Sequence, residues 1–118
     1  MLLTKQQILS ADDLPFEDVD VPEWGGTVRV RVMTGLERDA WEASVFQQKD
    51  GKAEFNQRNF RASLIARCIS DESGEVLFTD DEILSLGRKS SKALDRVFKV
   101  ASRINAISNQ DQEELEKN

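Results

Sequence analysis

The sequence contains no histidine, no tyrosine and a single cysteine, and these absences exclude several kinds of chemistry. A Cys–His nucleophilic pair cannot form, because the lone thiol of Cys68 has no imidazole to activate it. One cysteine also excludes an internal disulfide framework, and a zinc site would need one thiolate plus carboxylates, an uncommon donor set. No serine stands in a G-x-S-x-G motif, and no loop resembles a phosphate-binding loop. The residue inventory therefore offers no candidate catalytic centre and predicts that no metal or cofactor binds.

Long apolar runs are absent as well. No stretch approaches the roughly 20 residues of a membrane-spanning helix, and the N-terminal residues lack the long apolar segment of a secretory signal. These two features predict an intracellular protein that does not contact a membrane. The net charge of −6 argues against a protein that coats nucleic acid.

The chain has 118 residues, of which 39% are hydrophobic and 32% charged. A chain of this length buries about two thirds of its unfolded surface, enough for one real core. We expect residues 1–109 to form a single domain. Residues 110–118 have Leu115 as their one apolar anchor, which predicts an acidic flexible tail.

An N-terminal β-hairpin is the clearest predicted element. Valine and arginine alternate over residues 28–32, with the two-residue period of a strand that buries one face. The glycine pair at 25–26 suits a turn, and the preceding acidic segment alternates valine with aspartate. Pairing of the two strands would place Asp18 and Asp20 near Arg29 and Arg31.

Capping boxes at Thr4 with Gln7, Thr34 with Glu37 and Thr79 with Glu82, together with apolar periodicity, predict the helices. The expected segments are a short helix over Lys5–Ser10, a helix from Gly35 to about Gln48, a central core helix over Glu54–Ile69, a helix capped by Thr79 and stopped by a left-handed Gly87, and a last helix from Ser90 or Ser91 to Ile107. The predicted fold class is therefore α+β and mostly α-helical, with four to five helices and a small N-terminal β-hairpin.

The second helix carries apolar residues on two opposite faces. Leu36, Ala40 and Ala43 share a narrow arc, and Trp41 with Val45 lies roughly opposite. Two interpretations remain open. Either the helix is sandwiched within its own domain, or it offers Trp41 and Val45 to a partner.

The last helix has a cationic face opposite its apolar one. Five basic residues recur at spacings of four, four, three and four: Arg88, Lys92, Arg96, Lys99 and Arg103. This basic face is either an ordinary solvated surface or a docking site for an acidic partner. The partner can be nucleic acid, in which case the protein would be a small nucleic-acid-binding regulator. Alternatively, it can be an acidic protein segment, including that of a neighbouring copy. The acidic net charge favours protein.

Two groups of acidic residues resemble functional sites, but neither is predicted to be one. The twelve residues from Asp71 to Glu82 begin and end with carboxylates, as a calcium loop does, but the sharp-turn glycine stands fourth instead of sixth. The carboxylates over Asp80–Glu82 stand at a helix start, where the macrodipole favours them without any catalytic role.

Read from end to end, the sequence resembles the tail assembly chaperones of long-tailed bacteriophages. The resemblance rests on scaffold motifs and covers most of the chain. These motifs are K-Q-Q-I-L-x-A-D-D at Lys5–Asp13, V-D-V-P-E-W-G-G-T-V at Val19–Val28, T-G-x-E-R-D-A at Thr34–Ala40, N-F-R-A at Asn59–Ala62, D-E-S-G at 71–74, L-F-T at Leu77–Thr79 and L-G-x-K-S at Leu86–Ser90.

The resemblance implies a non-catalytic chaperone of the host cell cytoplasm that is absent from the mature virion. Its implied partners are the tape measure protein and, in some systems, the major tail protein that forms the tube. No binding residue carries over from the family. From the residues themselves, we expect self-association in which Trp41 and Val45 supply an apolar centre and the basic face a charged rim.

Overall fold

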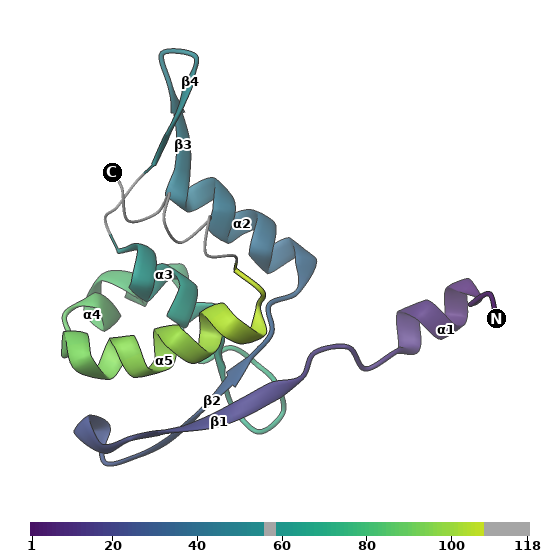
Figure 1. Ribbon diagram of the computed structural model, residues 1–118, viewed down its shortest axis with the longest axis horizontal. Helices are drawn as coiled ribbons and strands as arrows, with labels where there is room; N and C mark the ends of the chain where they lie inside the picture. The colour runs from purple at the N-terminus through teal and green to yellow at the C-terminus, as the bar shows by residue number, and fades with distance from the viewer. Residues whose placement is uncertain (56–58, 108–118) are drawn as a thin grey trace.

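The computed structural model describes residues 1–55 and 59–107. Its main sheet is three-stranded and antiparallel, in the order β1-β2-β5. Figure 1 shows β1 and β2 side by side in this sheet. The strands are β1 (Phe16–Val21), β2 (Gly26–Arg31) and β5 (Ile69–Ser70), and a separate hairpin pairs β3 (Phe46–Lys49) with β4 (Lys52–Phe55). The helices are α1 (Lys5–Ser10), α2 (Gly35–Val45), α3 (Phe60–Ala66), α4 (Ile83–Gly87) and α5 (Ser91–Ile104), with 3-10 turns η1 (Pro22–Trp24) and η2 (Asp80–Glu82). The predicted α+β class, with five helices and an N-terminal hairpin, is confirmed.

The predicted hairpin between β1 and β2 has the expected ion pair at its centre. Asp18 lies opposite Arg29, whose Nε donates to the Asp18 carboxylate at 2.8 Å. This contact holds the pKa of the Asp18 carboxyl below its usual range. Asp20 lies opposite Thr27 and accepts from its hydroxyl at 2.7 Å. Gly25 turns the chain with a φ of +74°, a conformation that glycine adopts without a steric cost.

Arg31 departs from the expected pattern, because it is buried instead of solvated. Its residue keeps 6% exposure, since β5 pairs with β2 on the side away from β1 and the following turn covers this end of the strand. The guanidinium donates to the carbonyl of Gly74 at 2.9 Å and to both carboxylate oxygens of Glu37 at 2.8 and 2.7 Å. Glu37 also accepts from the backbone N–H of Thr34 at 2.8 Å, which completes the predicted capping box. Arg31 therefore ties the sheet to the start of α2.

We expect this ion pair to make stability pH-dependent. The Arg31 guanidinium, helped by the Thr34 N–H, lowers the pKa of Glu37 from 4.5 to about 2. A depressed pKa in the folded state contributes stability that is complete above pH 4.5 and is lost as the pH falls towards about 2. Urea unfolding should therefore show a steeper loss below pH 4.5 in the wild type than in Glu37→Gln, where this group no longer titrates. If stability fell equally with pH in the two proteins, Glu37 would not be the group responsible.

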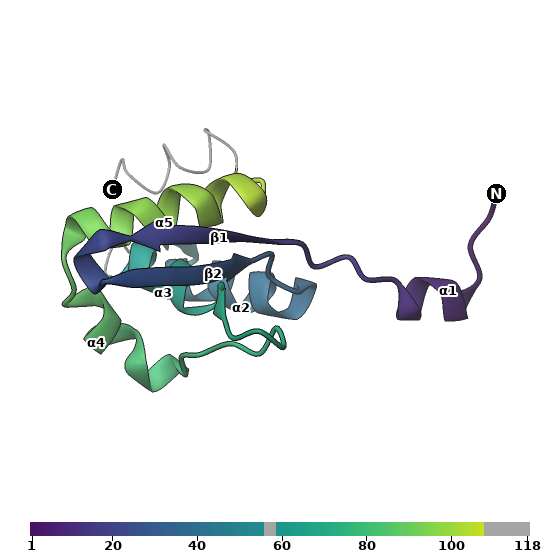
Figure 2. The ribbon, with the colours of Figure 1, turned by 90° about the horizontal axis from the view of Figure 1, so that it is seen from below.

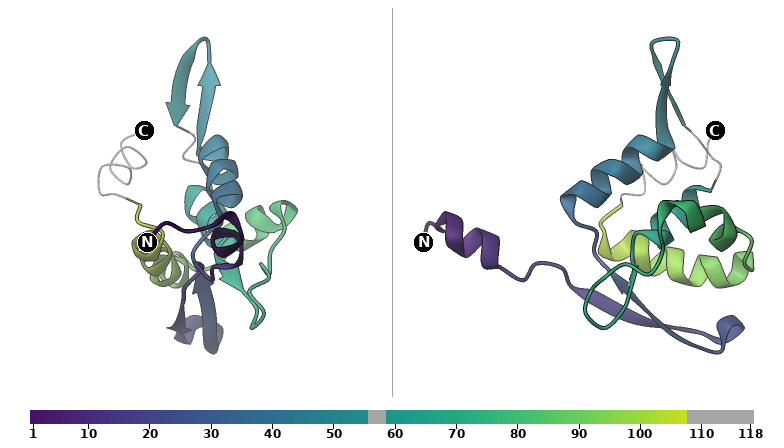
Figure 3. Two further views of the ribbon diagram at one scale, coloured as in Figure 1. Left: turned by 90° about the vertical axis from the view of Figure 1, so that its right-hand side faces the viewer. Right: turned by 180° about the vertical axis from the view of Figure 1, so that it is seen from behind.

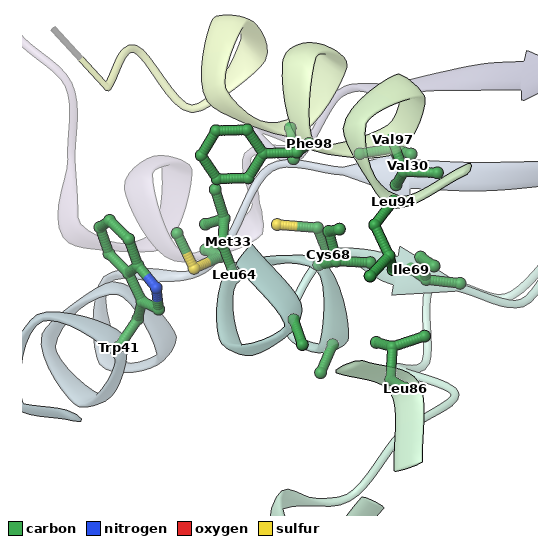
Figure 4. Close-up of a cluster of buried hydrophobic side chains, with 14 of the residues drawn as sticks. Val30, Met33, Trp41, Leu64, Cys68, Ile69, Leu86, Leu94, Val97 and Phe98 are labelled. Atoms are coloured by element: carbon green, nitrogen blue, oxygen red, sulfur yellow. The ribbon is translucent and has the colours of Figure 1, made fainter. Parts of the chain in front are cut away.

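The core lies between the sheet, α3 and the apolar face of α5 (Figure 4). Leu64 and Ile65 of α3 are fully buried, and each contributes about 1.5–3 kcal/mol by its removal from water. Phe98 of α5 packs edge-on against Phe60, with ring centroids 5.7 Å apart. Cys68 is buried here too, as predicted, and burial raises the pKa of its thiol to about 12.

Asn105 fastens the end of α5 to the junction between β2 and α2. Its Oδ1 accepts from the backbone N–H of Met33 at 2.8 Å, and its Nδ2 donates to the carbonyl of Ala101 at 2.8 Å. The backbone carbonyl of Asn105 accepts from Arg38 at 2.7 Å. Because Asn105 is buried, each of these polar groups needs its partner.

The predicted extent of the second helix is wrong in its last turn. The helix ends at Val45, and Phe46–Lys49 forms β3 of a hairpin that projects beyond α2 (Figure 3). Asp50 and Gly51 have φ angles of +54° and +77°, the signature of a two-residue type I′ turn. The Asp-Gly pair, interpreted from sequence as a polar loop, is the local signal for this hairpin.

The central helix is also shorter than predicted. Lys52–Phe55 forms β4, α3 starts only at Phe60 after a left-handed Asn59, and Ile69 belongs to β5. The apolar stripe that predicted one long helix is real but divides between α3 and the sheet.

The two C-terminal helices differ from prediction at their ends. Gly87 is helical and does not adopt the left-handed stop. An added Cβ there would lie 3.2 Å from Oδ1 of Asn59 and 3.6 Å from Cβ of Ala62, so a close approach to α3 explains the glycine. The last helix begins at Ser91 as predicted, with Ser90 as its cap, but it ends at Ile104 instead of Ile107, before a positive φ at Ala106. The predicted tail, residues 110–118, lies outside the described residues.

Among residues 1–55 and 59–107, every helix is too short or too polar to traverse a membrane.

Candidate partner-binding surface

Trp41 and Val45, the expected apolar centre of a partner site, lie in the core. Their exposed fractions are 2% and 1%, because α2 packs this face against the rest of the domain (Figure 4). Of the two interpretations left open by the sequence, burial within the domain is the one observed. A partner that docks on the folded chain does not reach these two side chains.

Much of the predicted basic face is neutralised by carboxylates of the same chain. Arg96 donates to Glu23 at 2.9 Å, and Arg103 pairs with Glu17 of β1. The contact with Arg96 holds the pKa of Glu23 below its ordinary value. The acidic N-terminal segment thus meets the basic face inside the monomer, because α5 packs along β1 (Figure 2). This arrangement weakens both a nucleic-acid interface and a charge-driven contact between copies along this part of α5.

The remaining members of the basic face divide into two groups. Lys99 pairs with Asp95 one turn earlier, at 3.1 Å. Arg88 precedes α5 and caps the C-terminus of α4. Arg88, its neighbour Lys89 and Lys92 are exposed and make no salt bridge to any described residue. Within the region of the basic face, the cations that no described carboxylate neutralises therefore gather at the N-terminal end of α5.

The acidic segment from Asp71 to Glu82 has structural roles. Asp71 Oδ1 accepts from the backbone N–H and hydroxyl of Ser73 and from the N–H of Glu75, within 3.1 Å, and these contacts lower the pKa of its carboxyl. Glu82 completes the capping box with Thr79, and Asp80 lies 3.4 Å from Arg67. No group of three or more possible ligands among the described residues is placed to hold a metal ion.

Two apolar grooves open on the surface. The first, here called the Trp24 groove, has a volume of about 500 Å³ and lies between η1, α4 and Phe78. Its lining residues are Glu23, Trp24, Phe78, Ser85, Leu86 and Lys89. The second, the Leu36 groove, has a volume of about 390 Å³ between α2 and the segment before η2. Its apolar lining residues are Leu36, Ala40, Ala66, Val76 and Phe78. Both volumes fall in the range of roughly 300–1,000 Å³ typical of binding pockets.

The N-terminal arm, residues 1–13, is the most exposed apolar segment of the described chain. It extends away from the domain and carries α1 near its tip (Figures 1 and 2). The capping box predicted for α1 is present between Thr4 and Gln7. No residue of α1 is buried, and the large apolar side chains of the arm are more than half exposed: Met1, Leu2, Leu3, Ile8 and Leu9. These exposed apolar side chains on one segment make the arm a candidate interaction site.

Sequence reasoning located the arm helix but missed its apolar surface as a site. The signal was available, because two leucines precede the cap and Ile8 and Leu9 follow it in a chain segment with nothing to cover them. The Trp24 groove had no such signal. It is assembled from Trp24, Phe78 and Leu86, which only the tertiary fold brings together.

Comparisons with known proteins agree with this architecture. The family model described as phage tail assembly chaperone matches residues 4–118. A search of curated proteins gave no match. Among solved structures, the tail assembly chaperone of bacteriophage HK97 superimposes with a TM-score of 0.56 at 20% identity, covering 88% of this chain and 92% of that one. The likeness to that structure shows a shared fold, and the family match extends over nearly the whole sequence. The chain therefore belongs to the phage tail assembly chaperone family.

Proposed function

We propose that this chain is a non-catalytic chaperone that binds the tape measure protein during tail assembly, with the major tail protein as a second partner. It acts in the host cell cytoplasm and does not remain in the mature virion. Family membership is the observation that carries this proposal. The apolar grooves and the exposed leucines beside them supply a suitable physical basis, since a chaperone must cover apolar surface that an unassembled partner would otherwise expose.

The Leu36 groove is the surface that we assign to the tape measure protein. Leu36 is 85% exposed at its edge, and Leu77, beside Val76 and Phe78 of the lining, is 53% exposed. An apolar floor with exposed aliphatic residues at the rim suits the apolar face of a partner helix.

Coexpression with the tape measure protein tests this proposal. The wild-type chain is expected to raise the soluble fraction of the tape measure protein severalfold, and Leu36→Asp with Leu77→Asp should abolish most of that gain. Leu84→Asp is the matched control, because Leu84 is 55% exposed but lines neither groove. A tape measure protein that stays insoluble with the wild type would contradict the proposed partner. Equal rescue by the double variant would contradict the groove.

A further inference from the structure

The N-terminal arm lacks a binding partner within the described part of its own chain. A six-residue helix with no buried side chain is marginal in water, because isolated helices shorter than about 12–15 residues rarely persist. Yet the local sequence carries two signals that favour a helix. Thr4 and Gln7 form the capping box, and Leu3 and Ile8 occupy the two positions of a hydrophobic staple. These local signals favour a helix, but they are too weak to stabilise one this short. The helix becomes stable when its apolar side chains are buried against another surface.

The Trp24 groove matches the arm in chemistry. Its floor is apolar, from Trp24, Phe78 and Leu86, and suits aliphatic side chains such as Ile8 and Leu9. Its rim includes Lys89, and Arg88 is adjacent in sequence; both are unpaired among the described residues. The arm ends in two exposed carboxylates, Asp12 and Asp13. Apolar and charged groups therefore complement each other along both surfaces.

The Leu36 groove is the weaker candidate for the arm. The charged side chains that line it already have partners, since Arg67 pairs with Asp80 and Glu37 with Arg31. It therefore offers no unpaired cation to the two aspartates of the arm.

The positions of arm and groove indicate a contact between copies. The arm leaves the domain at Phe16, where β1 begins, whereas Trp24 follows the other end of that strand (Figures 1 and 2). The arm points away from the groove of its own chain. We propose that the N-terminal arm docks in the Trp24 groove of a second copy of this chain, with Asp12 and Asp13 beside Arg88 and Lys89 of that copy. Because the two surfaces differ, the contact is head-to-tail and repeats from copy to copy.

Two variants that each lose one half of the contact test this proposal in sedimentation velocity with the purified chain alone, independently of any tail protein. The arm variant carries Ile8→Asp and Leu9→Asp, in a segment without buried residues, so the domain stays folded. The groove variant carries Arg88→Glu and Lys89→Glu at exposed positions. Wild type is expected to grow beyond a dimer with concentration. The arm variant should stay monomeric. The association affinity of the groove variant should be at least roughly tenfold lower than that of the wild type.

Mixing the two variants provides the decisive result. Each retains the half that the other has lost or weakened. At concentrations at which neither variant associates alone, a head-to-tail contact therefore predicts a 1:1 heterodimer. Leu36→Asp, which changes an exposed leucine in the other groove, is the control and should assemble like wild type. A monomeric wild type, assembly that survives in the arm variant, or a mixture that stays monomeric would each overturn the proposal.

A synthetic peptide of residues 1–14 tests the groove directly. Added to the arm variant, whose own groove is vacant, it should change the fluorescence of the half-buried Trp24 and saturate. The same titration with Arg88→Glu and Lys89→Glu added should show binding weaker by about tenfold. An unchanged signal, or equal affinity for both proteins, would place the arm elsewhere.

Discussion

Replacing Trp41 with alanine is expected to lower the free energy of unfolding by roughly 3–5 kcal/mol, the range for deleting a large buried aromatic side chain. The indole is 2% exposed and belongs to the cluster that joins α2 to the rest of the core. Since small domains unfold with about 5–15 kcal/mol, this loss would remove a large fraction of the total stability. Urea unfolding monitored by circular dichroism measures the effect.

Two matched variants separate burial from a surface role for Trp41. Leu36→Ala changes an 85% exposed residue of the same helix and should shift stability by no more than about 0.5 kcal/mol. Trp41→Phe keeps most of the apolar area and removes an indole N–H that has no acceptor among the described residues, so its cost should be well below that of alanine. A fully stable Trp41→Ala protein would show that this residue is not a core anchor.

Glu37→Gln is expected to produce the second large effect, a loss of roughly 2–4 kcal/mol at neutral pH. Arg31 has a side chain only 8% exposed, and neutralising Glu37 leaves its charge without a counterion. The expected loss stays below the upper limit for buried pairs, because the Glu37 side chain is 24% exposed and water reaches it. Urea unfolding at pH 7 checks the value.

Glu42→Gln is the control for the Arg31–Glu37 pair. Glu42 lies on the same helix and pairs with Arg38 at 2.9 Å, but its side chain is 48% exposed. An exposed pair of this kind contributes well under 1 kcal/mol, so its loss should be barely measurable. Equal effects of the two substitutions would mean that burial does not strengthen the Arg31–Glu37 pair.

Local signals in the sequence predicted those parts of the fold that local chemistry determines. The three capping boxes, at Thr4, Thr34 and Thr79, all form as predicted, because each needs only residues within one turn. The β1–β2 hairpin has the predicted pairing of Asp18 with Arg29. Alternation and capping are short-range features, so one sequence is enough to identify them.

Elements that depend on distant neighbours were not predictable in the same way. Ile69 continues the apolar stripe of α3 but becomes a strand residue, because β2 offers it a hydrogen-bonded edge. Arg31 follows the alternation of a solvated face, yet β5 and Glu37 bury it. The basic face was correctly placed along α5, but the carboxylates that neutralise Arg96 and Arg103 come from residues about 70–90 positions away. Sequence spacing defines a face, whereas only the fold defines what lies against it.

The acidic character of β1 has a consequence for how copies avoid unproductive contact. Strand β1 is an edge of the main sheet, and an exposed edge is a template for pairing with another chain. Glu17, Asp18 and Asp20 give this edge a run of carboxylates. Glu17 and Asp18 are paired with arginines, but Asp20 forms no salt bridge to a described residue. Two copies that approached edge to edge would bring their Asp20 charges together, at a cost in free energy. Asp20, beside the carboxylates that hold α5 and β2 against β1, therefore opposes lateral growth of the sheet into fibre-like aggregates.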